Sequence, residues 1–271
     1  MAFSSLHFRP AVPAKVLGRG RQWIQAAGRR WLWGGVNLLF PPACCLCEAA
    51  IEDFSGGPLI CTDCQPQLVS YVSACGACGS TLPAGLAAGD DCAWCRAQKL
   101  RFDRVVRLGR YDALLRQSVL SMKLPHQQPL SMALADLLCA RRSDELVALR
   151  PDVVIPIPMH WTRRLWRGVN NPEIVAQRVA AALKIPYPAQ LLVRSRHTEP
   201  QADLSPDQRR KNVHGAFRVR PHRDLPGARI LLVDDILTTG ATASEAARML
   251  KQAGAIEVCV AVVARAEGGH I

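Results

Sequence analysis

The sequence lacks any apolar stretch long enough to span a membrane, and it lacks a secretory signal followed by a cleavage site. Two arginines and two tryptophans in residues 28–35 give a faint resemblance to a twin-arginine signal. The apolar run behind them is short, however, contains Asn37 and leads directly into cysteines. These absences argue against a membrane-spanning or secreted protein, so we expect a cytoplasmic location.

Acidic residues are absent from residues 1–40, whereas arginine recurs there. In the whole chain of 271 residues, 34 Lys and Arg against 22 Asp and Glu give a formal net charge of +12. This charge suits phosphorylated small molecules and nucleic acid alike and does not choose between them. The spacing of Trp23, Ala27 and Trp31 predicts a helix within the basic extension. We expect it to pack on the rest of the protein rather than to bind nucleic acid or a membrane.

Eight of the eleven cysteines form four Cys-x-x-Cys pairs within residues 41–101. A catalytic zinc needs an open coordination position and usually has His or carboxylate ligands. Four thiolates per ion would instead fill the coordination sphere, as in structural sites. Two thiolates on one tight turn hold a metal from one side, and a second turn completes the tetrahedron, so we expect two structural zinc ions. Pairing of successive turns would give two stacked ribbons, and interleaved pairing is the alternative. The ligands are Cys44, Cys47, Cys61, Cys64, Cys75, Cys78, Cys92 and Cys95.

A run of apolar residues, Ile230 to Val233, is typical of a buried parallel strand, and it leads into Asp234 and Asp235. A Thr- and Gly-containing turn and a predicted helix at 243–253 follow. Gly permits close approach of an anion, and hydroxyls beside the N–H groups of a helix start form a phosphate cradle. The two carboxylates suit ribose hydroxyls or the water shell of Mg²⁺. The run therefore indicates a phosphorylated sugar, whereas the alternative is a simple helix cap. The turn consists of Thr238, Thr239, Gly240, Ala241 and Thr242.

Three further segments carry positive charge that could meet this ligand. The strand predicted at 152–158 precedes Arg163 and Arg164, and arginines beyond a parallel strand suit a pyrophosphate. Lys123 ends a predicted helix, where it either reaches a diphosphate or only offsets the helix dipole. The polar, basic residues 194–217 predict a mobile loop that closes over a charged ligand, or one that binds DNA phosphates.

These blocks together resemble the ComF family, in which a double zinc ribbon precedes a type I phosphoribosyltransferase domain. The resemblance covers residues 38–265 and includes the 5-phosphoribosyl-1-diphosphate (PRPP) signature. Val169 and Asn171 depart from the family's Arg-Gly-Phe-Asn-Gln block, and Pro125 follows Lys123 where a Gly-containing turn is common. The blocks that carry it are the Cys-x-x-Cys pairs, Lys123, Ile155-Pro-Ile-Pro158, Arg167-Gly168, Asn170, Arg194, Arg196, Thr198, Gln201, Arg209, Asn212, Phe217 and the signature at 233–242.

The resemblance implies an α/β fold, with a type I phosphoribosyltransferase-like parallel sheet and flanking helices. It also implies that Asp234 and Asp235 hold the ribose hydroxyls and act as the catalytic residues, residues 238–242 hold the 5-phosphate, and the Arg163/Arg164 loop holds the diphosphate with Mg²⁺. A link to DNA uptake in natural transformation is implied as well. We expect an extension at 1–40, a double zinc ribbon at 41–101 and a phosphoribosyltransferase-like domain at 102–271.

We therefore expect a Mg²⁺-dependent, PRPP-binding phosphoribosyltransferase-like protein. The alternatives are a non-catalytic PRPP sensor, a protein that binds single-stranded DNA with the competence machinery, and an adaptor that works through its zinc module.

Overall fold

The computed structural model describes residues 41–51, 54, 57–83, 85, 92–98, 100–159, 170–199, 204–222 and 225–267. The helix predicted within residues 1–40 and the loop with Arg163 and Arg164 lie outside these ranges. Residues 43–271 form one compact unit. None of the helices in the described ranges has both the length and the apolar character needed to cross a membrane.

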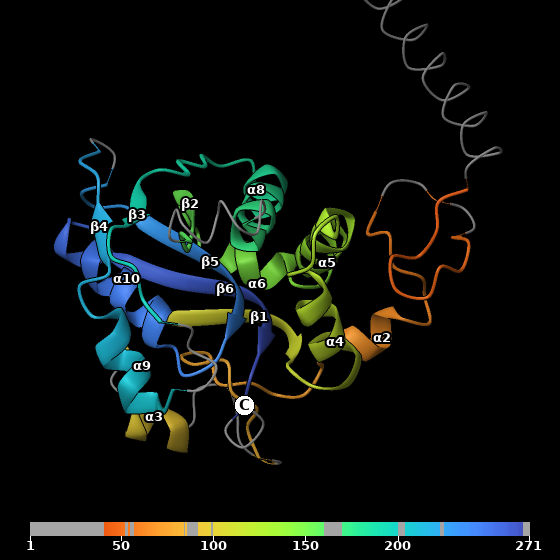
Figure 1. Ribbon diagram of the computed structural model, residues 1–271, viewed down its shortest axis with the longest axis horizontal. Helices are drawn as coiled ribbons and strands as arrows, with labels where there is room; N and C mark the ends of the chain where they lie inside the picture. Colours follow the sequence, from red (N-terminus) through yellow and green to blue (C-terminus); the bar gives the residue numbers. More distant parts are fainter. Residues whose placement is uncertain are drawn as a thin grey trace, which may run out of the picture. The chain divides into compact units, whose positions relative to one another are not determined.

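A four-stranded parallel sheet lies at the centre of this unit, with the strand order β1-β6-β5-β2 (Figure 1). Residues 230–233 are all buried, without the alternation of a half-exposed strand, because helices cover both faces of the sheet. The predicted parallel sheet with flanking helices is thus confirmed. The strands are β1 (Arg104–Arg110), β2 (Val153–Pro156), β5 (Arg229–Leu237) and β6 (Glu257–Arg265).

The two faces of the sheet carry separate hydrophobic cores, because successive side chains of a strand point to opposite sides. Leu231 and Val233 of β5 belong to the core that includes α5 and α8. Ile230 and Leu232 belong to the core that includes α10. The helices of the first face are α4 (Ala113–Ser121), α5 (Gln128–Arg141), α6 (Ser143–Ala148) and α8 (Asn171–Leu183), and the second face carries α10 (Ala241–Gln252).

A small antiparallel pair, β3 (Leu192–Arg194) with β4 (Phe217–Val219), lies on the α10 side of the molecule. Between these strands the chain forms α9 (Pro206–Val213). Ser205 caps this helix in a capping box with Gln208, which satisfies otherwise unpaired N–H groups. The segment predicted only as a basic loop therefore contains a helix, and its Ser-x-x-Gln spacing was the signal that could have revealed it.

The cysteine-rich segment covers the outer edge of β1. The Ser70 N–H donates to the Leu108 carbonyl at 3.1 Å, and the Val105 N–H donates to the Gly76 carbonyl at 2.8 Å. Gly109 permits the approach, because a Cβ there would lie 2.2 Å from the Leu68 carbonyl oxygen. Backbone groups that would otherwise form an open sheet edge are thereby paired.

The cysteines divide between the two faces of this edge. Cys44 and Cys64 join the core that includes α4 and α5, and α2 (Gln65–Leu68) contacts α4 (Figure 1). The later cysteines form a separate cluster near α3 (Ala93–Ala97), on the side of α9 and α10. Successive Cys-x-x-Cys pairs group together, as in the sequential pairing that the sequence left open beside interleaved pairing, and the chain between the two groups pairs with β1.

Candidate functional site

The two predicted acids lie at the carboxyl end of the sheet. Asp234 is in register with Val262 of β6, and the preceding Val233 is in register with Pro156 of β2. The Ile157 N–H then donates to the Val233 carbonyl at 2.8 Å. The chain beyond β2 therefore leaves the sheet beside the acids. In open α/β sheets, ligands bind at these carboxyl ends of the strands. The strand is longer than predicted and includes both acids, because β6 continues to pair with it as far as Leu237.

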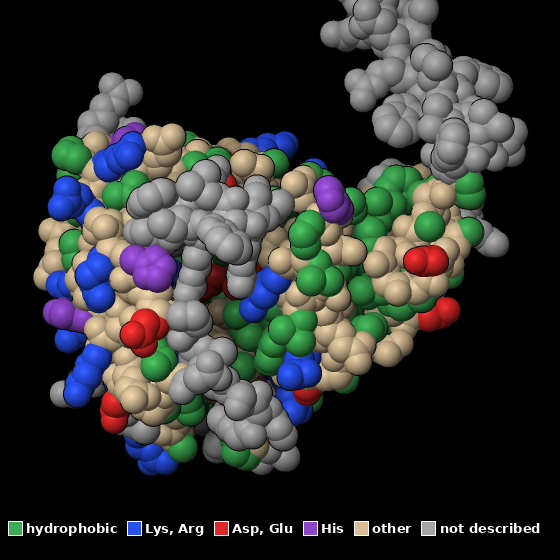
Figure 2. Space-filling model, in the orientation of Figure 1, with side chains coloured by type: hydrophobic (Ala, Val, Ile, Leu, Met, Phe, Trp, Pro, Cys, Tyr) green, Lys and Arg blue, Asp and Glu red, His purple; other side chains and the backbone are tan. Residues whose placement is uncertain are grey.

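Asp234 and Asp235 are both partly exposed, and an oxygen of Asp234 accepts the N–H of Asp235 at 2.9 Å. Burial and the Asp235 carboxylate raise the pKa of Asp234 well above its ordinary value, while the charge of Lys123 opposes the rise. Figure 2 shows a hollow with acidic side chains on its floor and a basic one beside them. A hydroxyl donor or a cation would relieve the repulsion between two such carboxylates.

The turn after β5 brings the start of α10 to the same carboxyl end of the sheet. Gly240 has φ +77°, a left-handed conformation that favours Gly, and it precedes the first helical residue. The Thr239 hydroxyl accepts the Ala241 N–H at 3.3 Å, so the capping interpretation accounts for this one threonine. No acidic residue lies in the first turn of α10, which leaves the positive end of the helix dipole to an anion.

Lys123 follows α4, and a buried asparagine fixes the backbone beside it. The Asn171 amide nitrogen donates to the Met122 carbonyl at 2.9 Å, and its oxygen accepts from the Ser131 hydroxyl at 3.2 Å. The structure thus brings the start of α8 and Lys123 together at the acids' side of the sheet. Asn171 was noted only as a departure from the family pattern, because its partners are distant in sequence.

Asn170 directly precedes α8, at the point where the described chain resumes. It is 4% exposed, and neither polar atom of its side chain has a hydrogen-bond partner among the residues that the structure describes. A buried amide without partners is unusual in a folded protein. Asn170 belongs to the motif of the resemblance but was not among the predicted site residues.

The arginines of the basic segment are partly committed to its own structure. Arg209 is 4% exposed, and its Nε donates to the Leu204 carbonyl at 2.9 Å. Arg196 donates to the carbonyls of Asn212 and His214 at 2.7 and 2.8 Å. These two arginines therefore shape the β3–β4 connection rather than form an open phosphate-binding surface.

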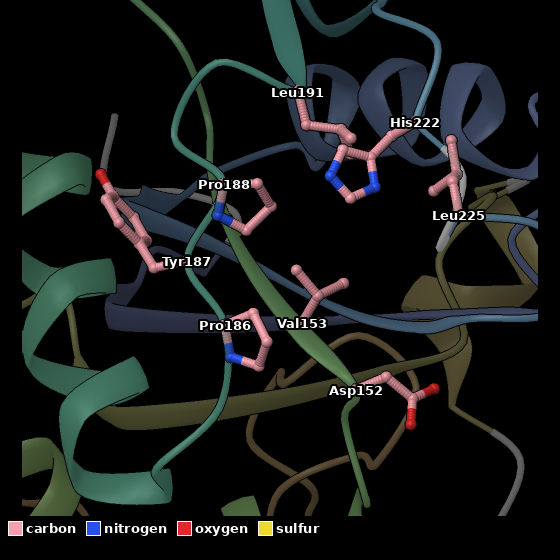
Figure 3. Close-up of a pocket in the computed structure, with 8 residues that line it drawn as sticks. All are labelled: Asp152, Val153, Pro186, Tyr187, Pro188, Leu191, His222 and Leu225. Atoms are coloured by element: carbon pink, nitrogen blue, oxygen red, sulfur yellow. The ribbon is translucent and has the colours of Figure 1, made fainter.

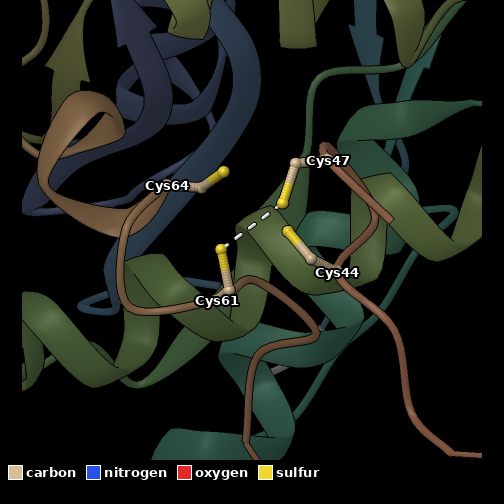
Figure 4. A group of neighbouring side chains, drawn as sticks. All are labelled: Cys44, Cys47, Cys61 and Cys64. Carbon is tan, nitrogen blue, oxygen red and sulfur yellow. Dashed lines mark hydrogen bonds between the residues drawn. The ribbon is translucent and has the colours of Figure 1, made fainter. Parts of the chain in front are cut away.

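The cysteines form two groups of four, each made from successive pairs. We call Cys44, Cys47, Cys61 and Cys64 the first cysteine cluster, and Cys75, Cys78, Cys92 and Cys95 the second cysteine cluster. Within each cluster the ligand atoms all lie within 4.8 Å of one another. The Cys47–Cys61 sulfur separation is 3.5 Å (Figure 4), and the Cys75–Cys95 and Cys78–Cys92 separations are 3.6 and 3.7 Å.

These separations fit a tetrahedral metal. Four thiolates at the usual zinc–sulfur bond length place neighbouring sulfurs about 3.8 Å apart. Burial raises the pKa of Cys44, but backbone hydrogen bonds from Cys61, Cys47 and Leu46 outweigh it and lower that pKa to about 6. In the same cluster, burial and the neighbouring cysteines raise the pKa of Cys64. Thiols so crowded retain protons that a bound cation would displace, so both clusters could hold zinc.

A pocket of about 370 Å³ lies at the opposite end of the sheet, where β2 begins (Figure 3). Its walls include Val153, Pro186 and Leu225, and its polar side chains include Asp152 and His222. Asp152 accepts the Arg229 N–H at 2.7 Å and so helps to join the starts of β2 and β5. Because the acids lie at the other ends of these strands, this pocket is separate from the candidate site.

Comparison with known proteins gives matches over most of the chain. The model of the phosphoribosyl transferase domain family matches residues 169–270. Competence protein F of Haemophilus influenzae is 31% identical over 229 residues, which cover 82% of this chain and 96% of that protein. DNA utilization protein YhgH of Salmonella typhi is 33% identical over 231 residues, with the same two coverages of 82% and 96%.

Among solved structures, a purine phosphoribosyltransferase from Pyrococcus horikoshii covers 59% of this chain and 77% of its own, with 18% identity and a TM-score of 0.30. The family assignment rests on the two relatives in sequence and on the domain match. The chain belongs to the ComF family, with two four-cysteine clusters ahead of a phosphoribosyltransferase domain.

Proposed function

We propose that this protein binds PRPP with Mg²⁺ at the carboxyl end of its sheet and acts as a phosphoribosyltransferase linked to DNA uptake. The observation that carries the proposal is the juxtaposition of paired acids with a helix start whose first turn contains no acidic residue. Asp234 and Asp235 lie near the end of β5 on one side of the site. Gly240 directly precedes α10 on the other side. Phosphate and diol then meet different, complementary groups of one continuous segment.

Each part of the ligand has assigned residues in this proposal. Asp234 and Asp235 accept the ribose hydroxyls, and residues 238–242 bind the 5-phosphate through backbone N–H groups and hydroxyls. Lys123 lies near enough to affect Asp234 and is placed to meet the diphosphate. Arg163 and Arg164 belong to the loop that leaves β2, and we assign them to the diphosphate as well.

The proposed reaction is a displacement at C1 of the ribose. The nucleophile forms a bond to C1 while the bond from C1 to the diphosphate oxygen breaks, and the electron pair leaves with the diphosphate. The two aspartates stabilise positive charge on the sugar, and Lys123 stabilises the leaving group. Mg²⁺ bound with the diphosphate would supply further neutralisation of charge. No covalent intermediate with the protein is required.

The cysteine clusters have a structural role in this proposal. Each presents four thiols at tetrahedral spacing, and we assign one zinc ion to each. The eleven cysteines include these eight, and all the described ones are free of disulfides, which suits a reducing compartment. We therefore assign the protein to the cytoplasm.

Titration calorimetry with PRPP and Mg²⁺ tests the binding proposal. The native chain should bind, and Asp235→Asn should weaken binding by at least tenfold, because an amide cannot accept both ribose hydroxyls as a carboxylate does. Asp136→Asn is the control, since Asp136 lies on α5 and pairs with Arg178 at 2.6 Å. No heat of binding with the native chain would refute the proposal.

Diphosphate release separates an enzyme from a PRPP sensor. The bound complex should release diphosphate when the correct base is added, whereas a sensor binds PRPP and releases none with any base. The DNA link is extended to this chain from relatives named for competence and DNA utilization. Direct binding of single-stranded DNA is the second candidate, favoured by the net charge of +12, and it predicts a gel shift that weakens with salt and survives Asp234→Asn.

A further inference from the structure

Arg265 ends β6 with a side chain that is 1% exposed. Its Nη1 donates to the carbonyl of Leu237 at 3.1 Å and to the carbonyl of Thr238. The Thr238 carbonyl belongs to the signature turn, residues 238–242, and the Leu237 carbonyl directly precedes it. The guanidinium therefore satisfies backbone acceptors at the point where β5 ends and the turn starts, and it fixes the direction in which the chain leaves the sheet.

The other nitrogens of the same guanidinium reach the second cysteine cluster. Nε donates to the carbonyl of the ligand residue Cys78 at 2.8 Å, and Nη2 donates to the Ser80 hydroxyl at 3.1 Å. The ring centroid of Trp94, which lies between Cys92 and Cys95, is 5.2 Å from Arg265 Cζ. One buried side chain thus touches both halves of the cluster and the signature turn.

Packing joins the same two regions independently of Arg265. A Cβ at Gly240 would lie 3.1 Å from Leu100 and 3.4 Å from Phe102, and both belong to the segment that follows the cluster. The Arg101 N–H donates to the Ser244 hydroxyl of α10 at 3.0 Å. Residues 100–102, which follow the last cysteine pair, therefore pack directly against the signature turn and the start of α10.

We propose that Arg265 is a positioning residue through which the second cysteine cluster holds the signature turn in its ligand-binding conformation. A metal bound by the second cysteine cluster would fix the backbone of Cys78 and the orientation of Trp94, and Arg265 would transmit that placement to the carbonyls of Leu237 and Thr238. The first cysteine cluster has no such role, because its buried members pack with α4 and α5. The consequence for PRPP affinity rests on the proposed function, whereas the coupling to the turn does not.

The test measures amide hydrogen exchange at residues 237–243 together with the zinc content of each variant. Cys95→Ser removes a ligand from the second cluster, and Cys61→Ser removes one from the first. Both should lose one of two zinc ions, but only Cys95→Ser should accelerate exchange at the turn, by at least tenfold. Equal exchange rates at the turn in the two variants would overturn the proposal.

Arg265→Lys tests the link without touching a metal ligand, and it remains informative if Cys95→Ser does not fold. Lysine keeps the charge but cannot reach all these acceptors at once. It should retain both zinc ions while the turn exchanges faster. Arg107→Lys is the matched control, since Arg107 is also buried and donates to Thr81 beside the cluster at 2.9 Å but to none of the turn's carbonyls. Unchanged exchange in Arg265→Lys would contradict the coupling.

Calorimetry with PRPP and Mg²⁺ then separates the two proposals. If the native chain binds PRPP, Arg265→Lys should lower the affinity at least tenfold and Arg107→Lys should leave it unchanged. If the native chain binds no PRPP but the exchange differences are present, the proposed function fails and the coupling stands. If the native chain and Arg265→Lys bind PRPP equally, the coupling has no effect on the site and this inference fails.

Discussion

Glu245, on α10, accepts the backbone N–H of Gly215 with one carboxylate oxygen at 2.7 Å. The same carboxylate accepts two hydrogen bonds from Arg248, at 2.7 and 2.9 Å. Gly215 leads into β4, so this one side chain fastens the β3–β4 connection to the helix that begins at the signature turn. Glu245 is 8% exposed, and its paired charge is largely shielded from water.

Glu245→Gln should destabilise the protein at pH 7 by about 2 kcal/mol, because hydrogen bonds to a buried charged group are lost. Burial raises the pKa of Glu245, but the hydrogen bonds from Arg248 and Gly215 outweigh it, so the pKa lies below its ordinary 4.5. A lowered pKa in the folded state contributes stability above the unfolded pKa, and this stability is lost as pH falls through the folded pKa.

The difference between Glu245→Gln and the native chain should therefore shrink below pH 4.5, as followed by urea denaturation across that range. Glu145→Gln is the control. Glu145 is exposed and pairs with Arg142 at 2.8 Å, so its loss should cost less than about 1 kcal/mol. A difference for Glu245→Gln that grows on acidification would contradict the assignment.

Asp234→Asn should have the opposite effect and stabilise the protein near neutral pH. Burial and the charge of Asp235 raise the pKa of Asp234, so the folded state binds the proton more tightly than the unfolded state does. The stability gained from that proton is complete below the unfolded pKa and is lost as pH rises through the folded pKa. The native chain therefore carries a cost at neutral pH that the neutral amide avoids.

Melting temperatures from pH 4 to pH 8 measure this effect. The excess stability of Asp234→Asn should be largest at pH 8 and should disappear toward the ordinary pKa of 3.8. Loss of PRPP binding in the same variant would show that a costly charge is kept for the ligand. Asp136→Asn should instead be slightly less stable, because it loses the ion pair with Arg178.

Gly109→Ala should destabilise the protein by about 3 kcal/mol, because the new methyl group would overlap the Leu68 carbonyl oxygen and force the backbone apart. Gly57→Ala is a matched control, since none of the residues that the structure describes lies within 4 Å of a Cβ there. Denaturant unfolding measures both variants. Equal stabilities would show that the cysteine-rich segment is not held against β1 as described.

Asn171→Leu should lower the free energy of unfolding by about 2 kcal/mol, because the Met122 carbonyl and the Ser131 hydroxyl lose a buried partner. Weaker PRPP binding should accompany it, since Lys123 follows Met122 directly. Gln190→Leu serves as the control for loss of an amide, because Gln190 is exposed and accepts from Arg220 at 2.8 Å. Its stability should stay within about 0.5 kcal/mol of the native value.

Local sequence patterns predicted the helices and strands whose buried faces can be recognised from their own apolar residues. The apolar run at 230–233, the periodic helix at 172–183 and the strand at 258–264 correspond to β5, α8 and β6 within a few residues. Asp234, Asp235 and Gly240 could be predicted as site residues because the strand, the acids and the turn follow one another directly in the sequence. These features need no knowledge of what packs against them.

Contacts between distant residues were not accessible in this way. Arg265 gave no sequence signal, because its partners at Cys78 and Leu237 are set by the fold. The α9 helix was missed because its residues are mostly polar and show no apolar stripe. The Cys-x-x-Cys spacing predicted two four-cysteine groups, but it carries no information on which face of a sheet each group will occupy.

The covered edge of β1 bears on how the protein emerges from the ribosome. β1 pairs on its inner side with β6, so Val105 has no strand partner on that side until Val260, which follows β5 and α10 in the chain, has been synthesised. During that interval the outer side of the strand is already occupied by the preceding segment. We expect this early local pairing to protect a half-built sheet from pairing with neighbouring nascent chains, a hazard that grows with the delay between partner strands.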